Sequence, residues 1–234
     1  MEKKEQFEIL LRVLRRFQKA GVLDELILIG SWCLYFYRFH FQDTPSIPPV
    51  RTMDVDFLIP HISRIRKEID IPVILKEEGF LPVFNRSNGI VKYNHPDLLV
   101  EFLLPELGKG GERAREIKNL HIKAVALRYL NLLLDHPLSV KYEGLEVRVP
   151  DPAVFALHKL IVSSRRAKAE KRAKDLEAAI GLLDFLWDRP GEIERMKKIV
   201  GSMPQTWRTL IRSVADKHYP PVSQMIKSVE TGLR

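Results

Sequence analysis

Two aspartates, Asp54 and Asp56, stand at the start of an apolar segment with the sequence MDVDFLI. Because the side chains of a β-strand alternate between its two faces, both carboxylates point to one side, while Val55 and Phe57 point to the other. Neighbouring carboxylates repel each other, and burying either of them without a partner costs several kcal/mol. The pattern therefore requires a partner for the two acids.

A third acid, Glu101, lies in the middle of the apolar run DLLVEFLLP, where a carboxylate is costly unless a cation lies nearby. Carboxylates from two strands can share divalent metal ions, and ligands that are all oxygen favour Mg²⁺ or Mn²⁺ over zinc. Substrate phosphates usually complete such a site, and two ions about 3.5–4 Å apart promote an in-line displacement. The alternative is three unrelated acids, each paired with an arginine or a lysine.

A turn that can bind phosphate is expected upstream of the acids. The segment LILIG predicts a short strand that ends at Gly30, and Ser31 is expected to cap the helix that follows. Glycine lets the backbone approach a phosphate closely, and the N–H groups at the start of a helix can bind it. Arg51 and Thr52 come just before the acids and can reach the same phosphates.

The segments ILIGS, MDVDFLI and LLVEFLL together resemble the signature of the nucleotidyltransferase superfamily, which includes DNA polymerase β. The Arg-x-x-Asp-x-Asp block, which follows a long connection, is most similar to the AbiEii and related toxin-type nucleotidyltransferases. The similarity covers residues 20–105 and extends weakly to about residue 185. It implies a small mixed sheet flanked by helices, with a helical C-terminal part that closes over the nucleotide.

The resemblance implies a role for each matching residue. Asp54 and Asp56 match the metal ligands, and Glu101 matches the third acid, which helps to deprotonate the acceptor hydroxyl. Gly30 and Ser31 match the turn that binds the triphosphate of the nucleoside triphosphate substrate.

Toxin-type members also carry a helical lysine and a later basic-Asp motif, which Lys159 and the pair Lys174–Asp175 match. Sixteen residues separate Lys159 from Asp175, so one straight helix would place them on separate faces. A break near the sequence SSRR is therefore required for the two side chains to meet.

The order of the expected elements predicts an α+β fold. Residues 1–150 are expected to form the mixed nucleotidyltransferase domain and residues 151–234 a helical C-terminal domain. Helices are predicted over residues 3–20, over the aromatic segment WCLYFYRFHF and within IKAVALRYLNLLL. Residues 62–80 are predicted to be mainly helical, with Pro72 near an interruption or a new helix start. A hairpin is predicted for SVKYEGLEVRVP, with its turn near Gly144.

Composition limits the possible partners. The chain has 234 residues, a formal net charge of +8 and a single cysteine, which excludes an internal disulfide and a zinc site built from cysteines. It shows no apolar signal peptide and no uncharged membrane-spanning run, so a soluble, cytoplasmic protein is expected. The positive charge favours anionic partners such as nucleotides and nucleic acid.

Three functions fit these observations. The first is an Mg²⁺-dependent enzyme that transfers a nucleotidyl group from an NTP to a hydroxyl of a tRNA-like RNA or of a protein. Such an enzyme can act as a toxin with an antitoxin partner. The second is an antibiotic-modifying transferase, although polycationic aminoglycosides would need an acidic pocket. The third is a non-catalytic nucleotide-binding protein, against which the intact acids argue. The basic run at residues 165–174 fits an RNA-binding face, a triphosphate clamp or a solvated helix face.

Overall fold

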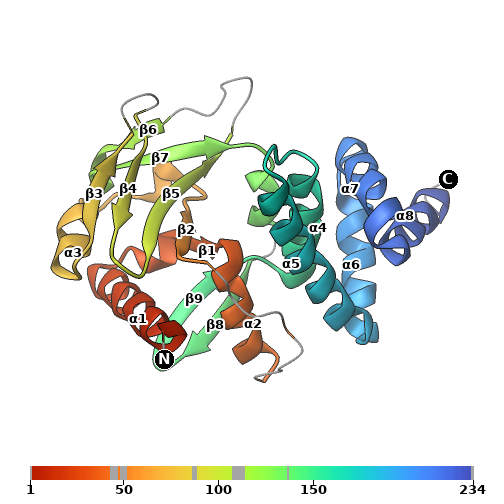
Figure 1. Ribbon diagram of the computed structural model, residues 1–234, viewed down its shortest axis with the longest axis horizontal. Helices are drawn as coiled ribbons and strands as arrows, with labels where there is room; N and C mark the ends of the chain where they lie inside the picture. The colour runs from red at the N-terminus through yellow and green to blue at the C-terminus, as the bar shows by residue number, and fades with distance from the viewer. Residues whose placement is uncertain are drawn as a thin grey trace. The chain divides into compact units, whose positions relative to one another are not determined.

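The computed structural model divides the chain into two compact units. One is formed by residues 1–43 and 49–150, and the other by residues 44–48 and 151–234. The first unit combines a mixed sheet with helices, and the second is helical (Figure 1). The predicted α+β class is therefore confirmed. The structure describes residues 2–42, 47, 52–85, 89–106, 114–135 and 137–232.

In the described part of the chain, a seven-stranded sheet is the centre of the first unit, and two of its inner strands, β2 (Asp54–Leu58) and β5 (Leu99–Pro105), run parallel to each other. The strand order is β1-β2-β5-β4-β3, and β7 pairs with both β5 and β6. β1, β4 and β3 pair antiparallel with their neighbours along this path, so the sheet is mixed as expected. The strands are β1 (Ile27–Ile29), β2 (Asp54–Leu58), β3 (Leu81–Phe84), β4 (Val91–Asn94), β5 (Leu99–Pro105), β6 (Ala114–Ile117) and β7 (Ile122–Leu127).

Helix α1 (Glu2–Ala20) covers one face of β2 and β5. The Phe17 ring lies 5.4 Å from the ring of Phe57 on β2 and 6.4 Å from that of Phe102 on β5. All three rings are fully buried, and burial of each such side chain contributes about 1.5–3 kcal/mol of hydrophobic stabilisation. Because strand side chains alternate, α1 fixes which residues of the two strands face away from it.

An aromatic cluster joins α1 to α2 (Cys33–His40) and to the hairpin of β8 (Leu138–Tyr142) and β9 (Leu145–Val149). The Phe7 ring stacks on Tyr35 at 4.3 Å, and the Phe39 ring lies 4.1 Å from Tyr142. The turn residues Glu143 and Gly144 both have positive φ, at 46° and 78°, which is typical of a two-residue hairpin turn. The predicted aromatic helix and the predicted hairpin are both present.

The helix predicted over most of residues 62–80 is wrong before residue 71, whereas the helix start expected near Pro72 is present. Only α3 (Ile71–Glu77) is α-helical, and Ile62–Arg64 form a short 3₁₀ turn. Pro72 explains the late start, because a proline fits the first turn of a helix and disfavours helical backbone before it. The Asp70 carboxylate caps α3 by accepting a hydrogen bond from the Val73 N–H at 3.0 Å.

The short helix predicted within IKAVALRYLNLLL is also wrong. Ile122–Leu127 form β7, which runs parallel to β5 with Leu103 opposite Val125, and Leu130–Leu134 form a 3₁₀ turn. Periodicity alone does not separate a short buried strand from a helix, and here the sheet pairing decides between them.

The second unit consists of helices, and its first helix is strongly capped. The buried Asp151 carboxylate accepts hydrogen bonds from the N–H groups of Ala153 and Val154 at 2.8 and 3.2 Å. None of the helices in the described part of the chain is both long and apolar enough to span a membrane. The helices are α4 (Pro152–Ser163), α5 (Ala169–Trp187), α6 (Pro190–Ser202), α7 (Gln205–His218) and α8 (Pro220–Gly232).

Candidate active site

The three acids, which we call the acid triad, lie on the face of the sheet that points away from α1. Asp54 and Asp56 are on β2 and Glu101 is on β5, and the parallel register sets Asp56 directly opposite Glu101. The alternate positions on β2, Val55 and Phe57, are fully buried, whereas Asp54 is exposed and Asp56 is half-buried. The apolar side chains of β2 pack on the side of α1, and the two aspartates therefore point to the opposite face of the sheet.

A lysine that sequence reasoning missed lies beside the acid triad. Tyr93 on β4 pairs with Val100 on β5, and continuing this register brings Lys92 next to Glu101. The Lys92 Nζ lies 2.8 Å from the Glu101 Oε2, and their side chains are 38% and 17% exposed. Burial alone lowers the pKa of Lys92, but its hydrogen bond to Glu101 and the charges of all three acids outweigh burial and raise the pKa above its ordinary value.

Gly30 forms the turn next to Asp56. Its φ is +74°, a backbone conformation that residues with a side chain rarely adopt, and a Cβ built on it would lie 2.6 Å from the Asp56 Oδ2. β1 ends at Ile29, and Gly30 and Ser31 belong to a 3₁₀ turn that leads into α2. The predicted cap by Ser31 is wrong, because neither this turn nor α2 has a side-chain cap.

Replacement of Gly30 by alanine is expected to disturb both the fold and the acid triad. The positive φ costs about 1–2 kcal/mol for an alanine. Gly144 is a matched control, because its φ is +78° and a Cβ there would meet nothing within 4 Å. In urea unfolding, Gly30→Ala should lose about 1 kcal/mol more than Gly144→Ala, since only Gly30 is crowded by a carboxylate. Equal losses would mean that Asp56 moves aside without cost.

Thr52 fixes the start of β2. Its Oγ1 accepts a hydrogen bond from the Asp54 N–H at 3.0 Å and lies 3.3 Å from the Asp54 Oδ2, to which it donates. The hydroxyl therefore orients one of the two aspartates. Arg51, which was expected to reach the same phosphates, lies outside the described residues.

Lys159 and Asp175 meet in the second unit, because the chain breaks between α4 and α5 as their contact requires. The Lys159 Nζ lies 2.6 Å from the Asp175 Oδ1, and the Arg166 Nε lies 2.8 Å from the Asp175 Oδ2. Burial alone raises the pKa of Asp175, but the two cations outweigh burial and lower it. The remaining predicted residue, Lys174, lies on the surface of α5 in an exposed ion pair with Glu170 at 2.8 Å.

The chemistry of the acid triad fits a divalent cation. Its donors are carboxylate oxygens, which suit Mg²⁺ or Mn²⁺. The positively charged side chain of Lys92 lies on the same face, beside Glu101. Among the residues that the structure describes, no group of three or more acidic, histidine or cysteine side chains is arranged to hold a metal ion. In this structure, one carboxylate oxygen of Glu101 is directed at the Lys92 ammonium and not at the two aspartates.

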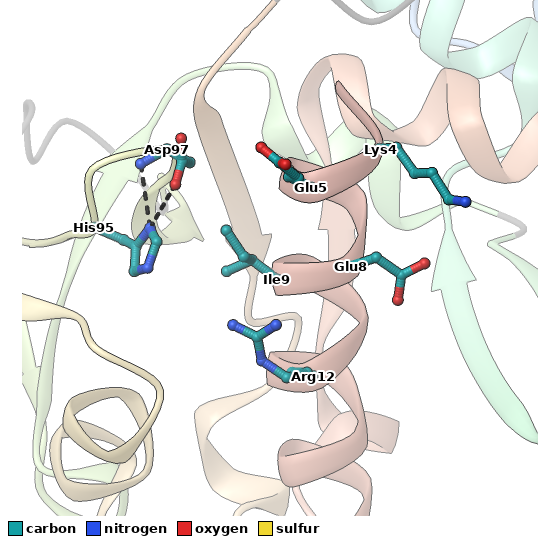
Figure 2. Close-up of a pocket in the computed structure, with 7 residues that line it drawn as sticks. All are labelled: Lys4, Glu5, Glu8, Ile9, Arg12, His95 and Asp97. Atoms are coloured by element: carbon teal, nitrogen blue, oxygen red, sulfur yellow. Dashed lines mark hydrogen bonds and ion pairs between the residues drawn. The ribbon is translucent and has the colours of Figure 1, made fainter. Parts of the chain in front are cut away.

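A separate pocket of about 480 Å³ lies between α1 and the loop that joins β4 to β5. Figure 2 shows its charged side chains, with Glu5, Glu8 and Arg12 on α1 and His95 beside Asp97 on the loop. The His95 Nδ1 accepts a hydrogen bond from the Asp97 N–H at 3.1 Å. None of the residues predicted for the site lines this pocket, so it is distinct from the acid triad.

Comparison with known proteins identifies the family of this chain. The sequence matches the family model described as nucleotidyltransferase over residues 8–196, which is most of the chain. The protein therefore belongs to the nucleotidyltransferase family and is a transferase by family. A comparison with curated protein sequences finds no match.

Solved structures also match most of the chain, and the first of them, with a TM-score above 0.5, shows a similar fold. An antigenic nucleotidyltransferase-like protein from Paracoccidioides brasiliensis is 16% identical, with 94% of this chain and 92% of that chain covered and a TM-score of 0.51. The antibiotic-resistance factor ANT(2'')-Ia in solution is 11% identical, with 94% and 100% covered and a TM-score of 0.48. Its crystal structure in complex with adenylyl-2''-tobramycin is 11% identical, with 91% of this chain and 98% of that chain covered and a TM-score of 0.48. Similarity at this level of identity concerns the fold alone.

Proposed function

We propose that residues 1–150 form a nucleotidyltransferase domain. This domain transfers a nucleoside monophosphate from an NTP to a hydroxyl group in a reaction that depends on Mg²⁺ or Mn²⁺. The observation that carries this proposal is the parallel register of β2 and β5, which sets Asp56 opposite Glu101 with Asp54 on the same face. Membership of the nucleotidyltransferase family supports the reaction class.

In this proposal each acid has a role. Asp54 and Asp56 hold the divalent ion, with Glu101 as the third carboxylate, and the ion when bound withdraws negative charge from the phosphates of the NTP. Glu101 accepts the proton of the acceptor hydroxyl, whose oxygen forms a bond to the α-phosphorus. The bond between the α-phosphorus and the bridging oxygen breaks, and pyrophosphate leaves. The backbone at Gly30 and Ser31, together with Thr52 and Arg51, binds the triphosphate.

We further propose that the acceptor is RNA, with protein as the alternative acceptor, and that the enzyme is a cytoplasmic, toxin-type nucleotidyltransferase controlled by an antitoxin. The 22 residues between Ser31 and Asp54 and the Arg-x-x-Asp-x-Asp block favour this branch. A net charge of +8 favours an anionic acceptor over an aminoglycoside. In the same proposal, Lys159 and the pair Lys174–Asp175 assist nucleotide binding.

The basic run at residues 165–174 supports an RNA acceptor, with one restriction. Arg165, Lys168 and Lys171 are exposed and are therefore available to phosphates. Arg166 is half-buried, and its Nε is paired with the buried Asp175. A test of RNA binding must therefore leave Arg166 in place, since its loss would also disturb the fold.

We expect that replacing Arg165, Lys168 and Lys171 with glutamine lowers nucleotidyl transfer to RNA and flattens the salt dependence of RNA binding. Each phosphate contact of a single strand contributes a slope of about −0.7 in log K against log salt, so losing three contacts should change the slope by about 2. The assay uses each radiolabelled NTP with Mg²⁺ and total RNA, total protein or an aminoglycoside. NTP binding, measured by calorimetry, should stay unchanged.

The matched control replaces Lys198, Lys217 and Lys227, three exposed lysines elsewhere in the second unit, with glutamine. An equal effect of both triple variants would show that only total charge matters. Loss of NTP binding in the first variant would make the basic run a triphosphate clamp. Label found on protein or on the aminoglycoside, with none on RNA, would exclude the RNA acceptor.

A further inference from the structure

Lys92 lies on the same face of the sheet as the acid triad, and the proposed function gives it no role. Across the sheet, paired positions form a row that contains Asp56 on β2, Glu101 on β5, Lys92 on β4 and Val83 on β3. The neighbour of Lys92 on β3 is thus apolar, whereas its neighbour on β5 is an acid. The 2.8 Å contact between the Lys92 Nζ and the Glu101 Oε2 follows from this cross-strand order.

We propose that Lys92 is a positioning residue, whose ammonium holds the Glu101 carboxylate in place. The divalent ion of the proposed function is then bound by Asp54 and Asp56 and not by Glu101. This inference rests on the proposed function and changes it in one respect, because it removes Glu101 from the carboxylates that hold the divalent ion. The aspartates bind the divalent ion, while Lys92 keeps the Glu101 carboxylate in place to receive the acceptor proton.

Charge balance favours this division. Three carboxylates and one ammonium leave a net charge of −2 on this face, which one divalent ion neutralises. The strands on either side of Glu101 supply opposite charges, with Asp56 on β2 and Lys92 on β4. Glu101 therefore lies between an acid that can share a metal ion and an ammonium that competes with that ion for its carboxylate.

Mn²⁺ binding to the whole protein, followed by the electron paramagnetic resonance signal of free Mn²⁺, tests the inference without an activity assay. In the presence of Lys92, Glu101→Gln should change the Mn²⁺ dissociation constant by less than about threefold. In a Lys92→Gln background, where Glu101 is free to join the metal site, the same substitution should weaken Mn²⁺ binding about tenfold. Lys92→Arg should restore the wild-type behaviour, because a guanidinium also holds a carboxylate.

The control is Lys76→Gln, which removes one positive charge from an exposed position on α3. The Glu101→Gln effect should stay below about threefold in that background. A tenfold loss of Mn²⁺ affinity from Glu101→Gln in the presence of Lys92 would overturn the inference, and so would equal effects with and without Lys92. Mn²⁺ binding that is unchanged in Asp56→Asn, or absent in the wild type, would overturn the metal site of the proposed function and the inference with it.

Discussion

Asp56→Asn is expected to lower the rate of nucleotidyl transfer by about 10³-fold or more, which corresponds to about 4 kcal/mol of transition-state stabilisation. Asparagine has nearly the same size as aspartate but lacks the negative charge that a divalent ion needs. The free energy of unfolding should change little, because the substitution keeps the size of the side chain and removes both repulsion between neighbouring carboxylates and attraction to the Lys92 ammonium. Single-turnover transfer of a labelled nucleotide and urea unfolding together measure the two effects.

The matched control is Asp97→Asn, which makes the same chemical change in the pocket beside α1. That variant should keep transfer activity within about twofold of wild type, since Asp97 lines a pocket that is distinct from the acid triad. If Asp56→Asn retains more than a tenth of the wild-type rate, the carboxylate does not hold a catalytic metal ion. If both variants lose activity equally, the assay reports net charge and not the site.

The largest effect on stability is expected from Asp175→Ala in the second unit. Asp175 is only 5% exposed and neutralises Lys159, whose side chain is 13% exposed, together with Arg166. Removing the shared carboxylate leaves a buried ammonium without its partner, which costs roughly 3 kcal/mol. Glu170→Ala is the matched control on the same helix, because its ion pair with Lys174 is exposed and should contribute little to stability.

The effect of Asp175 should also depend on pH in a defined direction. The pKa of Asp175 is lowered in the folded state, where Lys159 and Arg166 outweigh the effect of burial. A lowered pKa means that the stabilisation is fully present above the ordinary aspartate pKa of about 3.9 and is lost as the pH falls through the folded-state pKa. Urea unfolding at pH 7 and at pH 3 should therefore show a smaller difference between wild type and Asp175→Ala in acid. A difference that grows in acid would contradict this assignment.

The sequence predicts the elements that carry the acids because their local patterns are strong. The alternation in MDVDFLI and the apolar run around Glu101 leave few alternatives to strands, and the glycine at the end of LILIG marks a turn. The sharing of one face by Asp54 and Asp56 follows from strand geometry alone. The predictions fail over residues 62–80 and 122–127, where a proline and a distant sheet partner decide the structure.

Lys92 was not predictable in the same way. The segment VKYN indicates a strand, but nothing within it states that β4 pairs with β5 or in which register. The contact between Lys92 and Glu101 depends on that pairing and not on the distance along the chain. The partners of Asp175 lie closer to it in the sequence than Lys92 lies to Asp56. Even so, the pairing of Arg166 with Asp175 depends on where the chain breaks between α4 and α5, which the sequence does not state.

The coupling between the two faces of β2 has a consequence for how this protein can change by insertion or deletion. Asp56 faces away from α1 only because Phe57 packs beneath it against Phe17. A shift of the whole of β2 by one residue would reverse both faces at once, pushing carboxylates under the helix and aromatic rings into water. We therefore expect changes in chain length to be tolerated better outside the strand than within it.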